Sequence, residues 1–182
     1  ATYTQNVIFA QSNLMKSYLQ EKKYTEAVSY AEKVMANPEA EKNAKNDAQV
    51  IIARAAIRTG NEARAQKAYA EVQKSATGEL AAEALYYDAY FKHKAGNFKA
   101  SNDAVQKLAK EYSGYKLYGA KGLVLMGKTF YQLGDAYQAT YILDNVIKNF
   151  SQFPEVVQEA KQELAKIKAK EAKTNASVET NN

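Results

Sequence analysis

The chain has 182 residues, of which 46% are hydrophobic and 25% charged, so it can bury one core and stay soluble. Cysteine is absent, which excludes disulfides, zinc–thiolate sites and a cysteine nucleophile; a single histidine, His93, excludes a multi-histidine metal site within one chain. The net charge of +5 is mildly basic, and the basic run over residues 161–173 is typical of a solvated helix face rather than of a nucleic-acid footprint.

A short pattern recurs along the chain, in which a turn is followed five positions later by a small residue. The turns begin at Lys22, Gly60, Gly96 and Gly134, at intervals of 38, 36 and 38 residues. The small residues are Ala27, Ala65, Ser101 and Ala139. A fixed period of this length predicts helical repeats, which we place at about 5–37, 40–75, 78–112 and 115–150.

Each turn separates two segments whose apolar residues recur at spacings of three and four, which predicts amphipathic helices. In the second unit, such residues are Val50, Ala53 and Ile57 before the turn and Ala65, Ala68 and Val72 after it. The small residue lets the two helices approach closely, and a left-handed glycine is suited to ending the first helix.

After residue 150 we expect one more helix over residues 154–173, because Pro154 suits a first helical turn. Its apolar residues form one stripe: Val156, Val157, Ala160, Leu164 and Ile167. A helix with one apolar and one polar face can seal the end of a repeat array. Residues 174–182 lack apolar periodicity, and we predict a disordered tail.

This pattern resembles the tetratricopeptide repeat family. The fourth unit matches the family motif best, with Leu123, Met126-Gly127, Phe130, Gly134, Ala139 and Leu143; the third departs most, because Asp88 and Lys92 stand where Leu and Tyr are usual. The resemblance implies an all-α fold, a right-handed superhelix (solenoid) of about four hairpins with a C-terminal capping helix, forming one domain over residues 1–173.

The period and the many tyrosines are also similar to those of bacterial cell-envelope members of the family, which bind partner proteins. This resemblance implies a periplasmic or envelope location, with the cytoplasm as the alternative. Because the chain starts at Ala1 rather than Met, we expect a mature form or a piece of a longer protein. No apolar run is long enough to predict a membrane span.

Residues 122–129 fit the phosphate-loop pattern G-x-x-x-x-G-K-[ST]. A phosphate loop follows a buried strand, whereas residues 111–121 are polar and aromatic, so we interpret Gly127 as a helix-packing residue instead. His93 has no legible partnership with a carboxylate and a nucleophile, and we expect a surface or groove histidine. The sequence therefore predicts no enzyme and no cofactor.

In tetratricopeptide arrays the first helix of each pair lines a concave groove. The resemblance carries this role to a basic and aromatic set: Lys16, Arg54, Arg58, Tyr86, Tyr90, Lys94, Lys128 and Tyr131. Arginine and tyrosine are enriched at binding hot spots, and basic groups pair with carboxylates.

We therefore predict a scaffold that binds a protein or peptide with acidic groups in this groove. One alternative is a structural segment of a longer superhelix that makes contacts through its ends, with Val7, Ile8 and Phe9 exposed at the first end. A less expected alternative is nucleic-acid binding through the basic surface.

Overall fold

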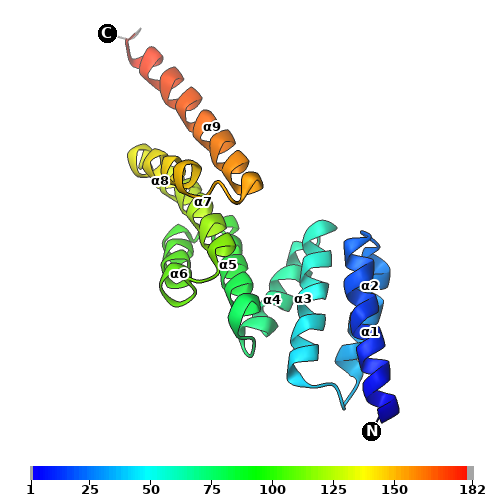
Figure 1. Ribbon diagram of the computed structural model, residues 1–182. Coiled ribbons are helices and arrows are strands. Elements are labelled where there is room, and N and C mark those ends of the chain that lie inside the picture. The colour runs from blue at the N-terminus through cyan, green and yellow to red at the C-terminus, as the bar shows by residue number, and fades with distance from the viewer. Residues whose placement is uncertain (1, 180–182) are drawn as a thin grey trace. The chain divides into compact units, whose positions relative to one another are not determined.

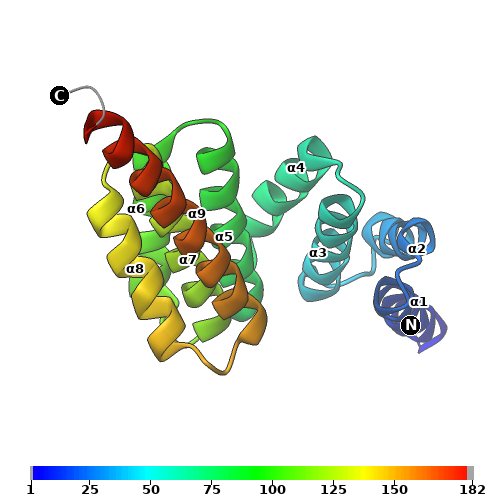
Figure 2. The same ribbon diagram turned by 90° about the horizontal axis from the view of Figure 1, so that it is seen from above.

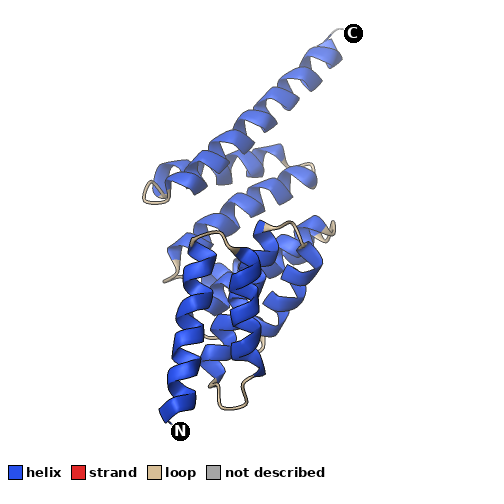
Figure 3. Cartoon of the chain, turned by 90° about the vertical axis from the view of Figure 1, so that its right-hand side faces the viewer, coloured by secondary structure: helices blue, strands red, loops and turns tan. Residues whose placement is uncertain are grey.

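The computed structural model describes the backbone of residues 2–179 and the side chains of residues 3–174. This part of the chain is all-helical, as the sequence predicted, and contains no strand (Figure 3). Its helices are α1 Thr2–Gln20, α2 Tyr24–Ala36, α3 Lys42–Arg58, α4 Glu62–Gln73, α5 Gly78–Lys94, α6 Phe98–Glu111, α7 Lys116–Gln132, α8 Ala136–Asn149 and α9 Pro154–Glu179.

Helices that follow one another in the chain pack against one another, and the chain divides into two compact units over residues 1–88 and 89–182 (Figure 1). In the first unit, α1 packs on α2, α2 on α3, and α3 on α4, while α1 also reaches α3. In the second unit, α6 packs on α7, α7 on α8, and α8 on α9, while α7 also reaches α9. The two units thus use the same order of packing.

The turn inside each helix pair has the same backbone conformation. Gly60, Gly96 and Gly134 have φ values of 75°, 78° and 85°, and Lys22 stands at the corresponding place with φ 61°. In all four turns the next N–H donates to a carbonyl five residues back, as from Asn61 to Ala56 at 2.8 Å and from Lys23 to Tyr18 at 2.8 Å. This bond pattern closes a helix over a left-handed residue, which explains why glycine recurs there.

Small residues allow the helices to cross closely. Ala27, Ala65, Ser101 and Ala139 are all completely buried. Ser101 also donates from its hydroxyl to the Ala89 carbonyl at 2.8 Å, so its polar atom is satisfied. The predicted crossing role of these positions is therefore compatible with their burial.

Residues 122–129 lie inside α7 and form no loop. A Cβ atom added to Gly127 would stand 2.9 Å from Leu143 Cγ on α8, and one added to Gly122 would stand 3.1 Å from Val105 Cγ1 on α6. Both glycines thus give neighbouring helices room to approach, and the resemblance to a phosphate loop is accidental.

The helix α9 covers one side of the second unit, where it lies against α7 and α8 (Figure 2). Its buried residues Val156, Ala160, Leu164 and Ile167 join one core with Val124, Leu143 and Val146. The structure differs from the sequence prediction at the far end, since α9 continues to Glu179 instead of ending at residue 173. Neither glycine nor proline follows Pro154, so nothing in the sequence stops the helix. Residues 180–182 of the predicted tail lie outside the described residues.

Candidate functional site

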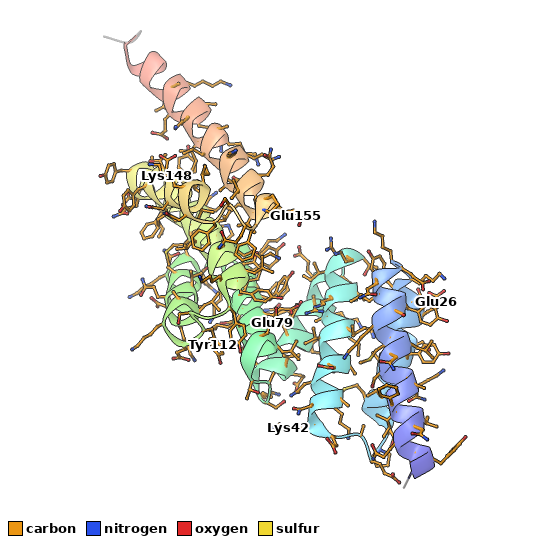
Figure 4. The ribbon with its side chains drawn as sticks, viewed as in Figure 1. Glu26, Lys42, Glu79, Tyr112, Lys148 and Glu155 are labelled. Carbon is orange, nitrogen blue, oxygen red and sulfur yellow. The ribbon has the colours of Figure 1, made fainter. Side chains whose placement is uncertain are left out.

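The helix pairs can be aligned on their turn residues, Lys22, Gly60, Gly96 and Gly134. We number the first helix of each pair backwards from its turn residue. Position −6 is then occupied by Lys16, Arg54, Tyr90 and Lys128, which all belong to the predicted binding set. Figure 4 shows the side chains along these helices.

Two of these cations pair with carboxylates that lie two helices further along the chain. Lys16 Nζ on α1 lies 2.7 Å from Asp47 Oδ2 on α3. Lys128 Nζ on α7 lies 2.5 Å from Glu159 Oε1 on α9 and 3.9 Å from Glu163 Oε1. A partner carboxylate at either lysine would therefore have to compete with an acid of the chain itself.

The third cation, Arg54, holds a buried carboxylate. Its Nε and Nη2 donate to Glu83 Oε1 and Oε2 at 2.8 and 2.5 Å. The side chain of Glu83 is 2% exposed, whereas that of Arg54 is 41% exposed, so the ion pair is buried on its acidic side only. The two-pronged geometry fixes the guanidinium in place.

Two tyrosines complete this cluster. The Tyr69 hydroxyl donates to Glu83 Oε1 at 2.8 Å, and its ring stacks on that of Tyr87 with centroids 4.2 Å apart. Burial, followed by the charge of Glu83, raises the pKa of both Tyr69 and Tyr87. Both phenols are therefore neutral hydrogen-bond donors at neutral pH, and the cluster ties α3, α4 and α5 together.

Arg58, one turn after Arg54, is exposed and makes no ion pair with any described residue. Its charge still reaches the cluster, because it acts to lower the pKa of Tyr87 against the larger effect of burial. Tyr86 packs edge-on against Tyr87 at 5.0 Å. In the first unit, Arg58 is thus the predicted cation that is open to a partner.

In the second unit, His93 is half-buried, and the charges of Lys94 and Lys128 act on it. Its Nδ1 lies 2.8 Å from Thr129 Oγ1, and the Thr129 hydroxyl donates to the Leu125 carbonyl at 2.9 Å. Because that hydroxyl has one hydrogen, His93 Nδ1 must carry the hydrogen and donate it to Thr129. Burial first, then Lys128 and Lys94, lower the pKa of His93, so the ring is neutral at neutral pH and the site around it is electropositive.

The remaining predicted residues have aromatic or ionic neighbours. Lys94 Nζ stands 5.9 Å from the Tyr90 ring centroid. Tyr131 donates to Glu171 Oε1 at 3.2 Å and lies below Lys170 Nζ at 5.7 Å. These contacts leave the aromatic rings half-buried rather than projecting into solvent.

Exposure of Val7, Ile8 and Phe9 would support the alternative in which the chain makes contacts through its ends. Phe9 is exposed, but Val7 is half-buried and Ile8 is buried. Ile8 and the buried Met15 are seven residues apart, so they lie on one face of α1 two turns from each other. The end of α1 therefore offers Phe9, and not Ile8, to an outside contact.

The sequence did not indicate a cleft that opens in the first unit between α2, α3 and the start of α4. It has a volume of about 320 Å³, with Ile52, Ala55 and Ala56 among its lining residues. Arg64 and Glu32 also line it, and they form an ion pair of 2.7 Å. A cleft of this size can take one or two side chains of a partner. The cleft is formed by residues from three helices together, so the spacing of residues within any one segment could not predict it.

The described residues contain no helix long and apolar enough to cross a bilayer. They also contain no group of three or more His, Asp or Glu side chains placed to hold a metal ion. The chain matches no model of a known protein family, and no curated protein is similar to it.

Proposed function

We propose that this chain is a protein-interaction scaffold, a tetratricopeptide-like superhelix that binds an acidic segment of a partner protein along its first helices. The observation that carries the proposal is the basic and aromatic character of the first helices, on which Arg58 is exposed and makes no ion pair with any described residue. Equivalent side chains on successive first helices within one unit are suited to an extended ligand.

The ion pairs refine which residues contact the partner. Lys16, Arg54 and Lys128 hold acids of their own chain, so their role is to fix the helices that present the binding surface. Arg58 in the first unit is a direct anchor for a partner carboxylate. Lys94 in the second unit adds to the positive charge around His93, to which an acidic partner is attracted. The aromatic rings of Tyr86 and Tyr90 offer apolar contact area.

The test is affinity capture with the purified chain from an extract of the source organism, followed by mass spectrometry of the bound proteins. Arg58→Glu combined with Lys94→Glu should lose the acidic partner. Lys67→Glu combined with Lys99→Glu makes the same change of net charge at exposed positions on α4 and α6, and should retain it.

A partner kept by the Arg58/Lys94 variant would place binding elsewhere and refute the proposed site. A partner lost equally from both variants would show that net charge alone holds it, which also refutes a specific site. Charge reversal of Arg54 or Lys128 would be a poor test, because it would leave Glu83 or Glu159 facing a like charge.

A further inference from the structure

The helix α9 can be aligned with the first helices of the four pairs, because an ion pair fixes its register. In α3, Asp47 at position −13 receives the cation from position −6 of α1. In α5, Glu83 at position −13 receives the cation from position −6 of α3. Lys128, at position −6 of α7, pairs with Glu159 of α9. Glu159 therefore stands at position −13 of α9.

The turn residue of this register is Ala172. It follows Gly134 by 38 residues, which is also the interval between the third and fourth turns. The fourth turn has glycine in the left-handed region, whereas alanine carries a Cβ atom and strongly favours helix. The absence of glycine at residue 172 explains why α9 continues without a turn to Glu179.

The burial of α9 residues agrees with the register. At position −8, Leu164 is 8% exposed, and the equivalent Ile52 and Met126 are 8% and 9% exposed. Positions −12 and −5 are likewise buried in α3, α7 and α9, where they hold Ala48, Gly122 and Ala160, and Ala55, Thr129 and Ile167. The same face of the helix is thus turned to the core in all three, and α9 occupies the place of a fifth first helix.

Position −2 of α9 is Lys170. The same position holds Arg58 in α3 and Lys94 in α5, the two cations that the proposed function connects with the acidic partner. Lys170 is exposed and, like Arg58, makes no ion pair with any described residue. In contrast to the cations at position −6 of α1, α3 and α7, its ammonium group is not held by an acid of the chain.

The surroundings of Lys170 combine a cation with an aromatic ring. Its Nζ stands 5.7 Å from the ring centroid of Tyr131 on α7. The adjacent Glu171 accepts a hydrogen bond from the Tyr131 hydroxyl at 3.2 Å. Lys166, one turn earlier, pairs with Glu163 at 2.7 Å. A partner carboxylate can therefore approach Lys170 while a neighbouring apolar side chain of the partner contacts the Tyr131 ring.

We infer that α9 is a fifth first helix and that Lys170 on it is a further anchor for the acidic segment of the partner. The segment lies over α7 and α9 of the second unit, with a carboxylate at Lys170 and apolar contact at Tyr131. This inference rests on the function proposed above, because it takes the partner to be acidic. It adds to the binding surface a helix that otherwise only covers the core.

Fluorescence anisotropy with a labelled oligo-glutamate peptide tests the inference on the full chain, at low ionic strength so that surface charges are not screened. We expect the wild-type chain to bind the peptide. Lys170→Glu should weaken binding at least about threefold, since it replaces an attraction by a repulsion. Lys170→Arg keeps the charge and should bind as the wild type does.

Lys161→Glu is the matched control. Lys161 lies on the same helix, is also exposed and makes no ion pair with any described residue, and the change in net charge is identical. It stands at position −11 of the register, away from position −2, so its effect on binding should be clearly smaller. Circular dichroism shows whether each variant keeps its helix content.

The same assay separates failure of the inference from failure of the proposed function. Equal weakening by Lys170→Glu and Lys161→Glu, or no weakening by Lys170→Glu, overturns the inference. If Arg58→Glu then still weakens binding more than Lys67→Glu does, the proposed function stands without Lys170. A wild-type chain that does not bind the peptide at all overturns both.

Discussion

The turn residues show how a single backbone angle shapes the sequence. Three of the four turns place glycine in the left-handed region, whereas Lys22 adopts it with φ 61°. A residue with a Cβ atom pays roughly 1–2 kcal/mol for that conformation. Lys22 is exposed, so its side chain offers little to offset the strain.

Lys22→Gly should therefore raise the free energy of unfolding by about 1 kcal/mol. The measurement is urea denaturation followed by circular dichroism. Lys23→Gly is the matched control, because the neighbouring residue is also exposed but has φ −85° and gains nothing from glycine. Equal effects of the two changes would mean that strain at Lys22 is not the cause.

Glycine inside α7 has a different role, which depends on what surrounds it. Gly127→Ala places a methyl group 2.9 Å from Leu143 Cγ and should destabilise the protein by about 1–3 kcal/mol. Gly119→Ala, in the same helix with open space around it, should stabilise by up to about 1 kcal/mol through helix propensity. Thermal unfolding of the pair measures both, and a destabilising Gly119→Ala would contradict this account.

The buried carboxylate of Glu83 makes a further prediction at this scale. Glu83→Gln removes the charge that Arg54 and Tyr69 bind, and we expect a loss of about 2–4 kcal/mol, moderated because Arg54 can turn to water. Glu79→Gln, on the exposed first turn of the same helix, should change stability by less than about 0.5 kcal/mol. Chemical denaturation of both variants would show the difference, and similar losses would argue against a special role for Glu83.

His93 makes stability depend on pH. Its folded pKa lies below the ordinary value of 6.5, so the unfolded chain binds a proton more readily than the folded one. The contribution is complete above pH 6.5 and is lost as the pH falls below that value toward the folded pKa. Compared with the wild type, His93→Gln should lose less stability between about pH 7.5 and pH 5 in parallel urea titrations. An unchanged pH dependence would show that other groups account for it.

At the scale of elements, the helix positions were largely predictable, because apolar spacing and left-handed turns are both local signals. The contacts of the predicted binding residues were not. Lys16 and Asp47 are 31 residues apart, and Arg54 and Glu83 are 29 apart, so no short pattern joins them. Alignment of the helix pairs on their turn residues would have shown that the cations Lys16 and Arg54 at position −6 are each followed by an acid at position −13 of the next pair. The end of α9 was mispredicted because polarity was taken as disorder, although lysine, alanine and glutamate all favour helix.

The role of α9 as a cover can be tested by truncation. Ending the chain after Phe153 exposes Val124, Leu143 and Val146, and should lower the unfolding temperature sharply or prevent folding of the second unit. Ending it after Lys173 keeps the whole buried stripe, whose last member is Ile167, and should change the unfolding temperature by only a few degrees. A large fall in the unfolding temperature of the chain that ends after Lys173 would show that the residues beyond it stabilise the fold.

For the whole molecule, the net charge of +5 gives little indication of function, because much of the charge is used internally. Three of the cations that suggested an acidic ligand, Lys16, Arg54 and Lys128, hold acids of the chain itself. The two ends also differ in character, with an uncharged face on α1 and a lysine-rich α9. A count of charges does not distinguish structural ion pairs from binding groups, and the arrangement of the helices was needed to do so.

The cation at −6 and the acid at −13 have a consequence for the order of the helix pairs. Only α3–α4 carries both, with Asp47 for the cation before it and Arg54 for the acid after it. Between α5 and α7 the two places are held by Tyr90 and Lys121, so the cation and the acid are both missing from one junction. A recombinant that moved the α7–α8 hairpin to follow α2 would set Lys121 against Lys16. The helix pairs are therefore not interchangeable, because each junction depends on the residues of both of its neighbours.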